Sequence, residues 1–295
     1  MQLKSKDGFL GRCDRTPRVE RTRRAIHCAV VFLLLASVPS LVVAADEMPD
    51  FVEVLMRSTF RIQGTGKCGT VFVMADPHGS ADGGMSLVML TAAHVLDSIS
   101  GDSATVVLRA KSSDGYRPLP RRLGIRRQGR PLWARHPKLD LAALPIDIPR
   151  EADFVPVSTN LLASDSSLEN FEIGAGYEIF TLGFPFCSGA NDAEFPILRS
   201  GHVAGFPLVP SSEYPTYFVD VAVFPGGSGG PVFIRARNPT YDGGVHLGTD
   251  LQFVLGILTK RWVAEKESVQ LGEVVQAMYL KELLSQVAGA RAGKR

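Results

Sequence analysis

Short runs of β-branched and aromatic residues recur along most of this chain, and they constrain its fold more than any other feature. Each run has four to eight residues and is bounded by Gly, Pro, Asp or Ser, which is typical of short β-strands separated by turns. The runs cover residues 70–74, 86–90, 104–108, 141–145, 178–182, 217–224, 231–234 and 253–259. With 29 glycines and 19 prolines among 295 residues, a coiled coil or a helical bundle is excluded, and we expect an all-β barrel or sandwich.

A polar segment at residues 158–176 divides these runs into two groups, and we infer two barrels joined there. The predicted domains are a signal peptide at residues 1–45, an N-terminal barrel at 46–160, a C-terminal barrel at 161–262, and a helix with a tail at 263–295. The helix is expected from Gly272 to Gly289, because apolar residues recur there at spacings of three and four. Residues 76–84 are expected to form a hairpin loop, and the arginines of 121–135 a solvated loop.

Residues 1–45 have the order of a secretory signal peptide. A segment with eight Lys or Arg is followed by an apolar run at 25–35 and by small residues ending at Ala44 and Ala45, so we expect cleavage there and export to the periplasm or the medium. The alternative is an uncleaved anchor, because residues 25–45 are long enough to span a bilayer; only then is a membrane partner expected. Without this segment the chain carries 24 basic and 27 acidic residues, a balance that does not favour a nucleic-acid partner.

Three short segments each contribute a chemically useful side chain. His94 ends an apolar strand and carries the side chain whose ordinary pKa suits proton transfer near neutral pH. Asp140 stands at the start of another apolar run, and Ser228 is surrounded by four glycines that allow a tight backbone with inward N–H groups. Taken alone, each has an ordinary structural explanation as a strand end, a cap or a turn. Together they supply a base, an orienting acid and a nucleophile.

These segments resemble the chymotrypsin-like serine peptidases, especially the bacterial trypsin-like and high-temperature-requirement branches. The resemblance covers about residues 51–262 and rests on four motifs: TAAHV at 91–95, LDLAAL at 139–144, RSGHVAGF at 199–206 and PGGSGGPV at 225–232. The histidine, aspartate and serine occur in the chain order of that family. The resemblance implies two six-stranded antiparallel β-barrels followed by a C-terminal α-helix, and an exported serine endopeptidase that acts on a protein or peptide without a cofactor or metal.

The family's catalytic roles carry over to the matching positions. The resemblance implies that Ser228 attacks the scissile carbonyl to form an acyl-enzyme, that His94 transfers the proton, and that Asp140 orients the imidazole. It also implies an oxyanion hole made by the backbone N–H groups of Gly226 and Ser228.

The cysteines leave two interpretations open. Cys13 and Cys28 fall in the expected signal peptide, so the mature chain keeps Cys68 and Cys187 as a bridged pair or as two buried thiols. Neither has the spacing of a zinc site. The family resemblance places Cys68 on the opening strand and Cys187 in a loop near the oxyanion hole, which implies that the two are bridged.

Departures from the animal digestive enzymes carry information. Gly227 stands where zymogen-type relatives have an aspartate, so we expect no activation by cleavage of a pro-segment. Alignment to the family's serine motif implies that the base of the primary specificity pocket falls near Ala222, which disfavours Arg or Lys in the substrate, although a shift of two residues would place Asp220 there. The 33 residues after Trp262 leave no room for a peptide-binding PDZ module.

Two other functions are weighed against a peptidase. A trypsin-fold binding module without catalysis is disfavoured because the three side chains and the surrounding glycines are all present. An esterase with the same triad is disfavoured because residues 231–234 after the serine predict a strand, whereas a nucleophile elbow is followed by a helix. Among the remaining histidines, His136 is the one rival to His94, because it precedes Asp140 by only four residues.

Overall fold

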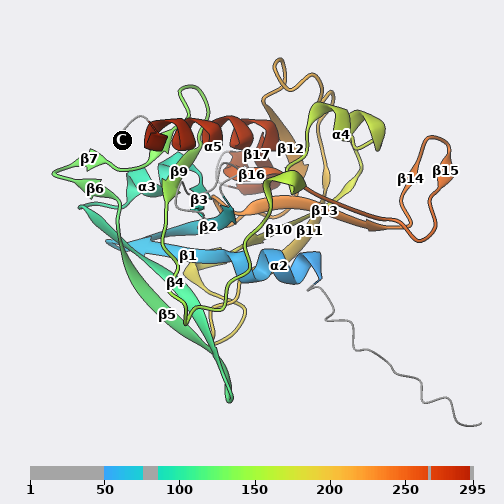
Figure 1. Ribbon diagram of the computed structural model, residues 1–295. Helices are drawn as coiled ribbons and strands as arrows, with labels where there is room; N and C mark the ends of the chain where they lie inside the picture. Colours follow the sequence, from blue (N-terminus) through green and yellow to red (C-terminus); the bar gives the residue numbers. More distant parts are fainter. Residues whose placement is uncertain (1–49, 76–85, 265–266, 293–295) are drawn as a thin grey trace, which may run out of the picture. The chain divides into compact units, whose positions relative to one another are not determined.

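A computed structural model describes residues 50–75, 86–264 and 267–292 of the chain (Figure 1). The expected signal peptide at 1–45 and the expected hairpin loop at 76–84 lie outside these residues. The described part is built mainly of antiparallel strands, with a closed six-stranded barrel and a C-terminal helix. The all-β fold expected from the sequence is confirmed.

The N-terminal half is a seven-stranded sheet. Its strands, in spatial order, are β5 (Gly115–Gly124), β4 (Ser103–Ser112), β1 (Thr59–Gly64), β2 (Lys67–Ala75), β3 (Leu87–Thr91), β9 (Ala142–Pro145) and β8 (Ala134–Arg135). Its helices are α2 (Phe51–Ser58), which precedes β1, and α3 (Ala93–Ser98), which follows β3. A two-stranded sheet of β6 (Arg126–Arg127) and β7 (Arg130–Pro131) precedes β8. This half differs from the expected six-stranded barrel because its strand order does not close.

The C-terminal half is the closed barrel. Its strands are, in order, β10 (Glu178–Gly183), β11 (Ile197–Val203), β12 (Thr216–Asp220), β17 (Glu267–Gln276), β16 (Asp250–Ala264) and β13 (Pro231–Arg237). Between the halves lie the short helices η1 (Thr159–Leu161) and α4 (Asp165–Asn170), and after β10 comes η2 (Pro185–Cys187). A small hairpin of β14 (Thr240–Tyr241) and β15 (Gly244–Val245) extends between β13 and β16.

The expectation of a helix from Gly272 is wrong, and so is the barrel boundary at residue 262. Helix α5 (Ala277–Ala292) begins five residues later, and residues 267–276 form β17 instead. β17 pairs with β12 on one side and β16 on the other, with Val275 opposite both Thr216 and Ile257. Closing the barrel satisfies the backbone groups of this segment, and Val274 and Val275 are β-branched residues suited to a strand. Tertiary pairing therefore overrides the helical spacing.

The basic run expected as a solvated loop is largely structured. Arg121 and Arg122 lie on β5, an edge strand of the sheet whose side chains are mostly exposed. Charged residues and prolines on an edge strand hinder pairing with other chains, so this composition suits the position. Arg126 has a structural role, since its guanidinium donates to the carbonyl oxygens of Ile99 and Leu96 and lies over the Trp133 ring at 4.9 Å.

Strand β2 explains how two cores form around one sheet. Its residues from Gly69 to Met74 are buried in succession, because side chains of both faces are covered. Val71 and Val73 point into one apolar cluster, whereas Phe72 and Met74 point into the other. Each large side chain buried here contributes about 1.5–3 kcal/mol to stability.

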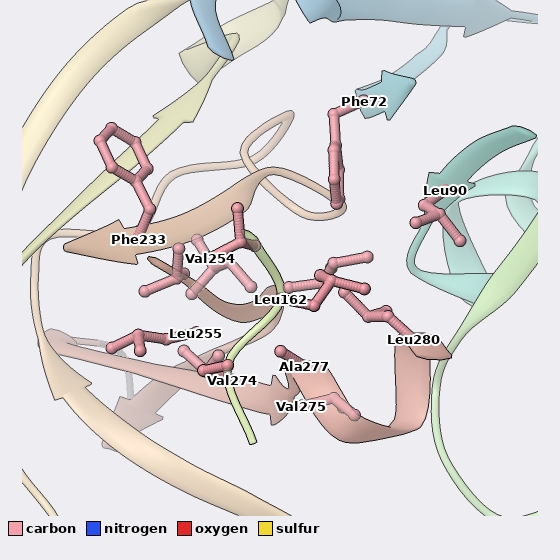
Figure 2. Packing of buried hydrophobic residues seen from close by; sticks show 14 of the residues in the cluster. Phe72, Leu90, Leu162, Phe233, Val254, Leu255, Val274, Val275, Ala277 and Leu280 are labelled. Carbon is pink, nitrogen blue, oxygen red and sulfur yellow. The ribbon is translucent and has the colours of Figure 1, made fainter. Parts of the chain in front are cut away.

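The second of these clusters joins the two halves. It combines Phe72 and Leu90 from the N-terminal sheet with Val254 of β16 and Leu280 of α5, and Figure 2 shows these side chains in one apolar cluster with Leu162 of the linking segment. Close packing across the junction holds the two halves in one relative position. No helix in the described ranges is long and apolar enough to cross a membrane.

Candidate active site

His94 and Asp140 are brought together by the pairing of β3 with β9. Thr91 at the end of β3 lies opposite Ala142 at the start of β9, so the residues just beyond these strand ends meet. His94 is in the first turn of α3, where a backbone N–H has no partner within the helix. That N–H donates to Asp140 Oδ1 at 2.9 Å, and His94 Nδ1 lies 2.5 Å from Asp140 Oδ2.

The environment keeps Asp140 ionised. Burial raises the pKa of this carboxyl group, but the hydrogen bonds from His94 and, when the imidazole is protonated, its charge outweigh that effect, so the pKa of Asp140 lies below its ordinary value. An ionised Asp140 accepts from both His94 N–H groups and directs the imidazole proton to Nδ1. The opposite ring nitrogen, Nε2, is then left as a proton acceptor on a side chain that is 48% exposed.

The loop that carries Ser228 is fastened to the strand that adjoins β3. The backbone N–H of Thr70 on β2 donates to the Ser228 carbonyl oxygen at 2.9 Å, and the Thr70 hydroxyl donates to the Gly226 carbonyl oxygen at 2.7 Å. The Thr91 hydroxyl in turn donates to the Thr70 carbonyl oxygen at 2.7 Å. The serine loop of the barrel is thus fixed to the two N-terminal strands that lead to His94.

Close approach of the backbones explains the glycine after the serine. Gly229 has a φ of +92°, and a Cβ atom on it would lie 2.0 Å from the Thr70 carbonyl oxygen and 2.2 Å from Thr91 Oγ1. No side chain fits in that space, and an L-residue rarely adopts that φ.

Among the hydrogen bonds of the described residues, none joins Ser228 Oγ to His94. Ser228 Oγ donates to the Thr259 carbonyl oxygen at 3.4 Å, a long hydrogen bond, whereas the hydrogen bonds of His94 go to Asp140. The histidine and the aspartate predicted from the sequence are therefore paired, whereas the Ser228 side chain is oriented toward the Thr259 carbonyl. A turn about the serine Cα–Cβ bond changes this orientation on the picosecond to nanosecond timescale.

Two backbone N–H groups of the serine loop have fixed orientations. The Pro225 carbonyl oxygen accepts from the Phe186 N–H at 2.7 Å, and the Gly227 carbonyl oxygen accepts from the Gly230 N–H at 3.3 Å. In a trans peptide the N–H points opposite to the carbonyl, so the N–H groups of Gly226 and Ser228 are turned away from these anchors. Neither N–H donates a hydrogen bond to any residue in the described part of the chain.

A disulfide joins Cys68 on β2 to Cys187 in η2, with 5.8 Å between the two Cα atoms. It holds the segment that contains Phe186, the donor to the Pro225 carbonyl oxygen. Phe186 and Cys187 both have positive φ values, 53° and 65°, which are strained for residues other than glycine. The disulfide therefore stabilises the turn that orients the Gly226 N–H.

We expect replacement of both Cys68 and Cys187 by serine to lower the free energy of unfolding by about 2–4 kcal/mol, because the bridge closes a long loop of chain. Urea unfolding of the variant and of the oxidised parent measures this difference. The parent should show no reactive thiol when the mature chain is denatured without reductant. Two titratable thiols in that sample would contradict the bridge.

A small cavity lies beside the serine loop. It is lined by Thr181, Leu182, Gly183, Pro185, Arg199, Ala222, Val223, Phe224, Gly227 and Leu258. Ala222 is in the lining, whereas Asp220 is exposed at the end of β12. None of the described residues around this cavity is acidic, and Arg199 places a positive charge in its wall over the Phe224 ring at 4.7 Å.

Sequence reasoning missed two residues of the site. Thr70 fastens the serine loop by its backbone and its hydroxyl, and its only signal in the sequence was its place two residues after Cys68 on the expected opening strand. Thr259 accepts from Ser228 Oγ through its carbonyl, which no side-chain pattern reveals. Within the described ranges, no three His, Cys, Asp or Glu residues gather to hold a metal ion.

Comparison with known proteins defines the class of this chain. The sequence profile of the trypsin-like peptidase domain matches residues 69–238, more than half of the chain. The chain therefore belongs to the trypsin-like peptidase family. No curated protein matches the sequence.

The solved structures that match this chain include two proteases. The HtrA-type protease AlgW, solved with a tripeptide, is 19% identical with a TM-score of 0.48, and the match covers 81% of this chain and 64% of AlgW. The Rv3671c protease from M. tuberculosis H37Rv, in an inactive form, is 18% identical with a TM-score of 0.44 over 80% of this chain and 91% of that protein. The chain thus spans less than two thirds of the AlgW chain it matches.

Proposed function

We propose that the chain is an exported endopeptidase in which Ser228 is the nucleophile, His94 the general base and Asp140 the group that orients it. The observation that carries this proposal is the 2.5 Å contact between His94 Nδ1 and Asp140 Oδ2, which leaves the other imidazole nitrogen free to accept a proton. The serine loop, fastened to β2 through Thr70, supports the proposal because it holds the nucleophile on the adjoining elements.

In the proposed reaction, Ser228 Oγ turns from Thr259 toward His94 as a peptide binds. The oxygen attacks the scissile carbonyl carbon while its proton passes to His94 Nε2, and the imidazolium formed is stabilised by Asp140. The N–H groups of Gly226 and Ser228 would bind the oxyanion, each contributing about 3–4 kcal/mol to transition-state stabilisation. His94 then protonates the leaving amine, and water releases the acid from the acyl-enzyme by the reverse steps.

Export is the second part of the proposal. It is supported by the signal-like order of residues 1–45 and by the Cys68–Cys187 bridge, since such bonds form and persist in oxidising compartments. Expression of the full chain in a bacterial host, followed by N-terminal sequencing of the exported form, tests this part. A start near Asp46 is expected, and a chain that retains residue 1 in the membrane fraction would support the anchor instead.

Labelling with a fluorophosphonate probe tests the catalytic part. We expect the mature chain to be labelled, Ser228→Ala to be unlabelled, and His94→Ala to be labelled much more slowly, because the hydroxyl is then without its base. Ser285→Ala, which removes an exposed serine hydroxyl on α5, is a matched control that should label normally. Labelling of Ser228→Ala would identify another nucleophile, and an unlabelled parent would favour the binding module.

We expect the chain without residues 1–45 to react with this probe without any internal cleavage. Gly227 has no carboxylate that could pair with a newly formed N-terminus. The hydrogen bonds to the Pro225 and Gly227 carbonyl oxygens already orient the N–H groups of Gly226 and Ser228. Intact mass spectrometry before and after labelling measures the length of the reactive species. Reaction confined to an internally cut form would contradict this expectation.

We expect peptides with Ala, Val or Leu before the scissile bond to be cleaved at least about 10-fold faster in kcat/KM than peptides with Lys or Arg there. A basic side chain would meet Arg199 and no carboxylate in the cavity beside Ala222. A library of fluorogenic peptides that differ at this position measures the ratio. Ala222→Asp should shift the preference toward basic residues, whereas Asp220→Ala should leave it unchanged.

A further inference from the structure

The turn that carries Asp140 is built around a second histidine. His136 follows β8, and its backbone N–H donates to the Leu141 carbonyl oxygen at 3.0 Å, which closes the turn. Inside the turn, His136 Nδ1 accepts from the Leu139 N–H at 3.0 Å and lies 3.3 Å from the Lys138 N–H. The imidazole therefore supplies the acceptor for the backbone on the N-terminal side of Asp140.

This ring is covered by the C-terminal helix. The His136 side chain is only 5% exposed, and the Tyr279 ring of α5 packs edge-on against it with 5.5 Å between the ring centroids. Since Nδ1 accepts, the ring proton is on Nε2, which faces Glu282 Oε2 at 3.7 Å, beyond hydrogen-bond distance. Helix α5 is itself anchored, because Leu280 and Leu283 are fully buried in the core shared with Leu141.

We propose that His136 is a positioning residue for catalysis, and that α5 holds it in place so that the C-terminal helix sets the alignment of Asp140 with His94. The inference rests on the proposed roles of His94, Asp140 and Ser228. Its basis is that the Asp140 carboxylate accepts two hydrogen bonds from His94, one from the backbone nitrogen at 2.9 Å and one from Nδ1 at 2.5 Å. Small shifts of the turn that carries Asp140 would break this pairing.

The physical reason is the cost of leaving the donors of this half-buried turn without their acceptor. Without an acceptor at Nδ1, the N–H groups of Lys138 and Leu139 lose their partner, and the turn must open to water or shift. A displacement of about 1 Å in a catalytic group reduces the rate by about 100-fold. The effect falls on the chemical step, because none of the residues of this turn lines the cavity beside the serine loop.

Two substitutions separate positioning from general stability. His136→Asn keeps an acceptor oxygen three bonds from Cα, in the place of Nδ1, whereas His136→Leu keeps apolar bulk and removes the acceptor. His202, exposed on β11, provides the matched controls His202→Asn and His202→Leu. We expect His136→Leu to lower kcat about 10- to 100-fold with KM within about 3-fold of the parent, and His136→Asn to keep kcat within about 3-fold.

A spectroscopic measurement tests the inference without turnover. In a Ser228→Ala background, the proton shared by His94 Nδ1 and Asp140 should give a downfield ¹H NMR resonance, assigned by its loss in Asp140→Asn. We expect this resonance to shift or broaden in His136→Leu and to persist in His136→Asn. Tyr279→Leu, which removes the covering ring, should show the same change to a smaller degree.

The outcomes are distinct. A folded His136→Leu with the parent kcat and resonance would overturn the inference, and so would His136→Asn losing as much kcat as His136→Leu. If His136→Leu does not fold, the inference is tested by the resonance and kcat of His136→Asn and Tyr279→Leu. A Tyr279→Leu variant with the kcat and resonance of the parent would show that α5 does not set the alignment. A parent that the fluorophosphonate does not label would refute the proposed function, while the resonance would still report on the turn.

Discussion

Replacement of Asp140 by asparagine is expected to lower kcat about ten-thousand-fold with little change in structure. The His94 backbone N–H, which donates to Oδ1 at 2.9 Å, would keep the amide oxygen of the new side chain in that position. The amide NH₂ would then face His94 Nδ1, which must become an acceptor and leave the ring proton on Nε2. An imidazole in that tautomer cannot take the proton of Ser228.

Steady-state kinetics on a peptide substrate, with circular dichroism as a check on folding, measures this loss. Asp97→Asn is the matched control, because Asp97 is an exposed carboxylate on the same helix as His94 and pairs with Arg135 at the surface. Its effect on kcat should stay within about 2-fold, since exposed ion pairs contribute little to structure. An Asp140→Asn enzyme with more than a tenth of the parent kcat would show that Asp140 does not select the tautomer.

Replacement of Gly229 by alanine is expected to lower both stability and activity. The added Cβ would lie 2.0 Å from the Thr70 carbonyl oxygen, which belongs to a buried strand and cannot move aside as the end of a flexible side chain would. We expect the free energy of unfolding to fall by about 2–4 kcal/mol as the serine loop separates from β2. Activity should fall at least about 1000-fold, because the Ser228 N–H loses its orientation.

Gly66→Ala separates the clash from the backbone conformation. Gly66 has a φ of +74°, similar to that of Gly229, but nothing lies within 4 Å of its added Cβ. This control should lose only about 1–2 kcal/mol of stability from the left-handed conformation and keep its activity. Urea unfolding and fluorophosphonate labelling of both variants give the comparison. Equal losses for the two variants would show that the contact with Thr70 is unimportant.

Hydrogen bonds to its carbonyl groups orient the peptide groups of the serine loop. Carbonyl groups of Pro225, Gly227 and Ser228 are each bound by an N–H from the surrounding elements, so the intervening N–H groups face the other way. Because these anchors come from β2, from η2 and from the loop itself, the orientation depends on both halves of the molecule. This explains why the apolar cluster that joins the halves matters for a site whose side chains it does not include.

Local pattern was sufficient for some parts of the fold and insufficient for others. All eight strand-like runs overlap strands, because a pleated strand places alternate side chains on two faces and residues such as Val71 and Phe72 record that period. The segment of Gly272 was misread as helix because its apolar spacing fits both structures. The pairing of Val275 with two neighbouring strands, which decides between them, involves residues far along the chain.

The kinds of groups present, their order and the all-β class follow from local properties of the chain, namely side-chain chemistry and short-range periodicity. The pairing of His94 with Asp140, the Cys68–Cys187 bridge and the hydrogen bond from Ser228 to Thr259 appear only in the folded molecule. These contacts depend on strand register and on the packing of the two halves. The three contacts join residues separated by 46, 119 and 31 positions, which is beyond the reach of any local pattern.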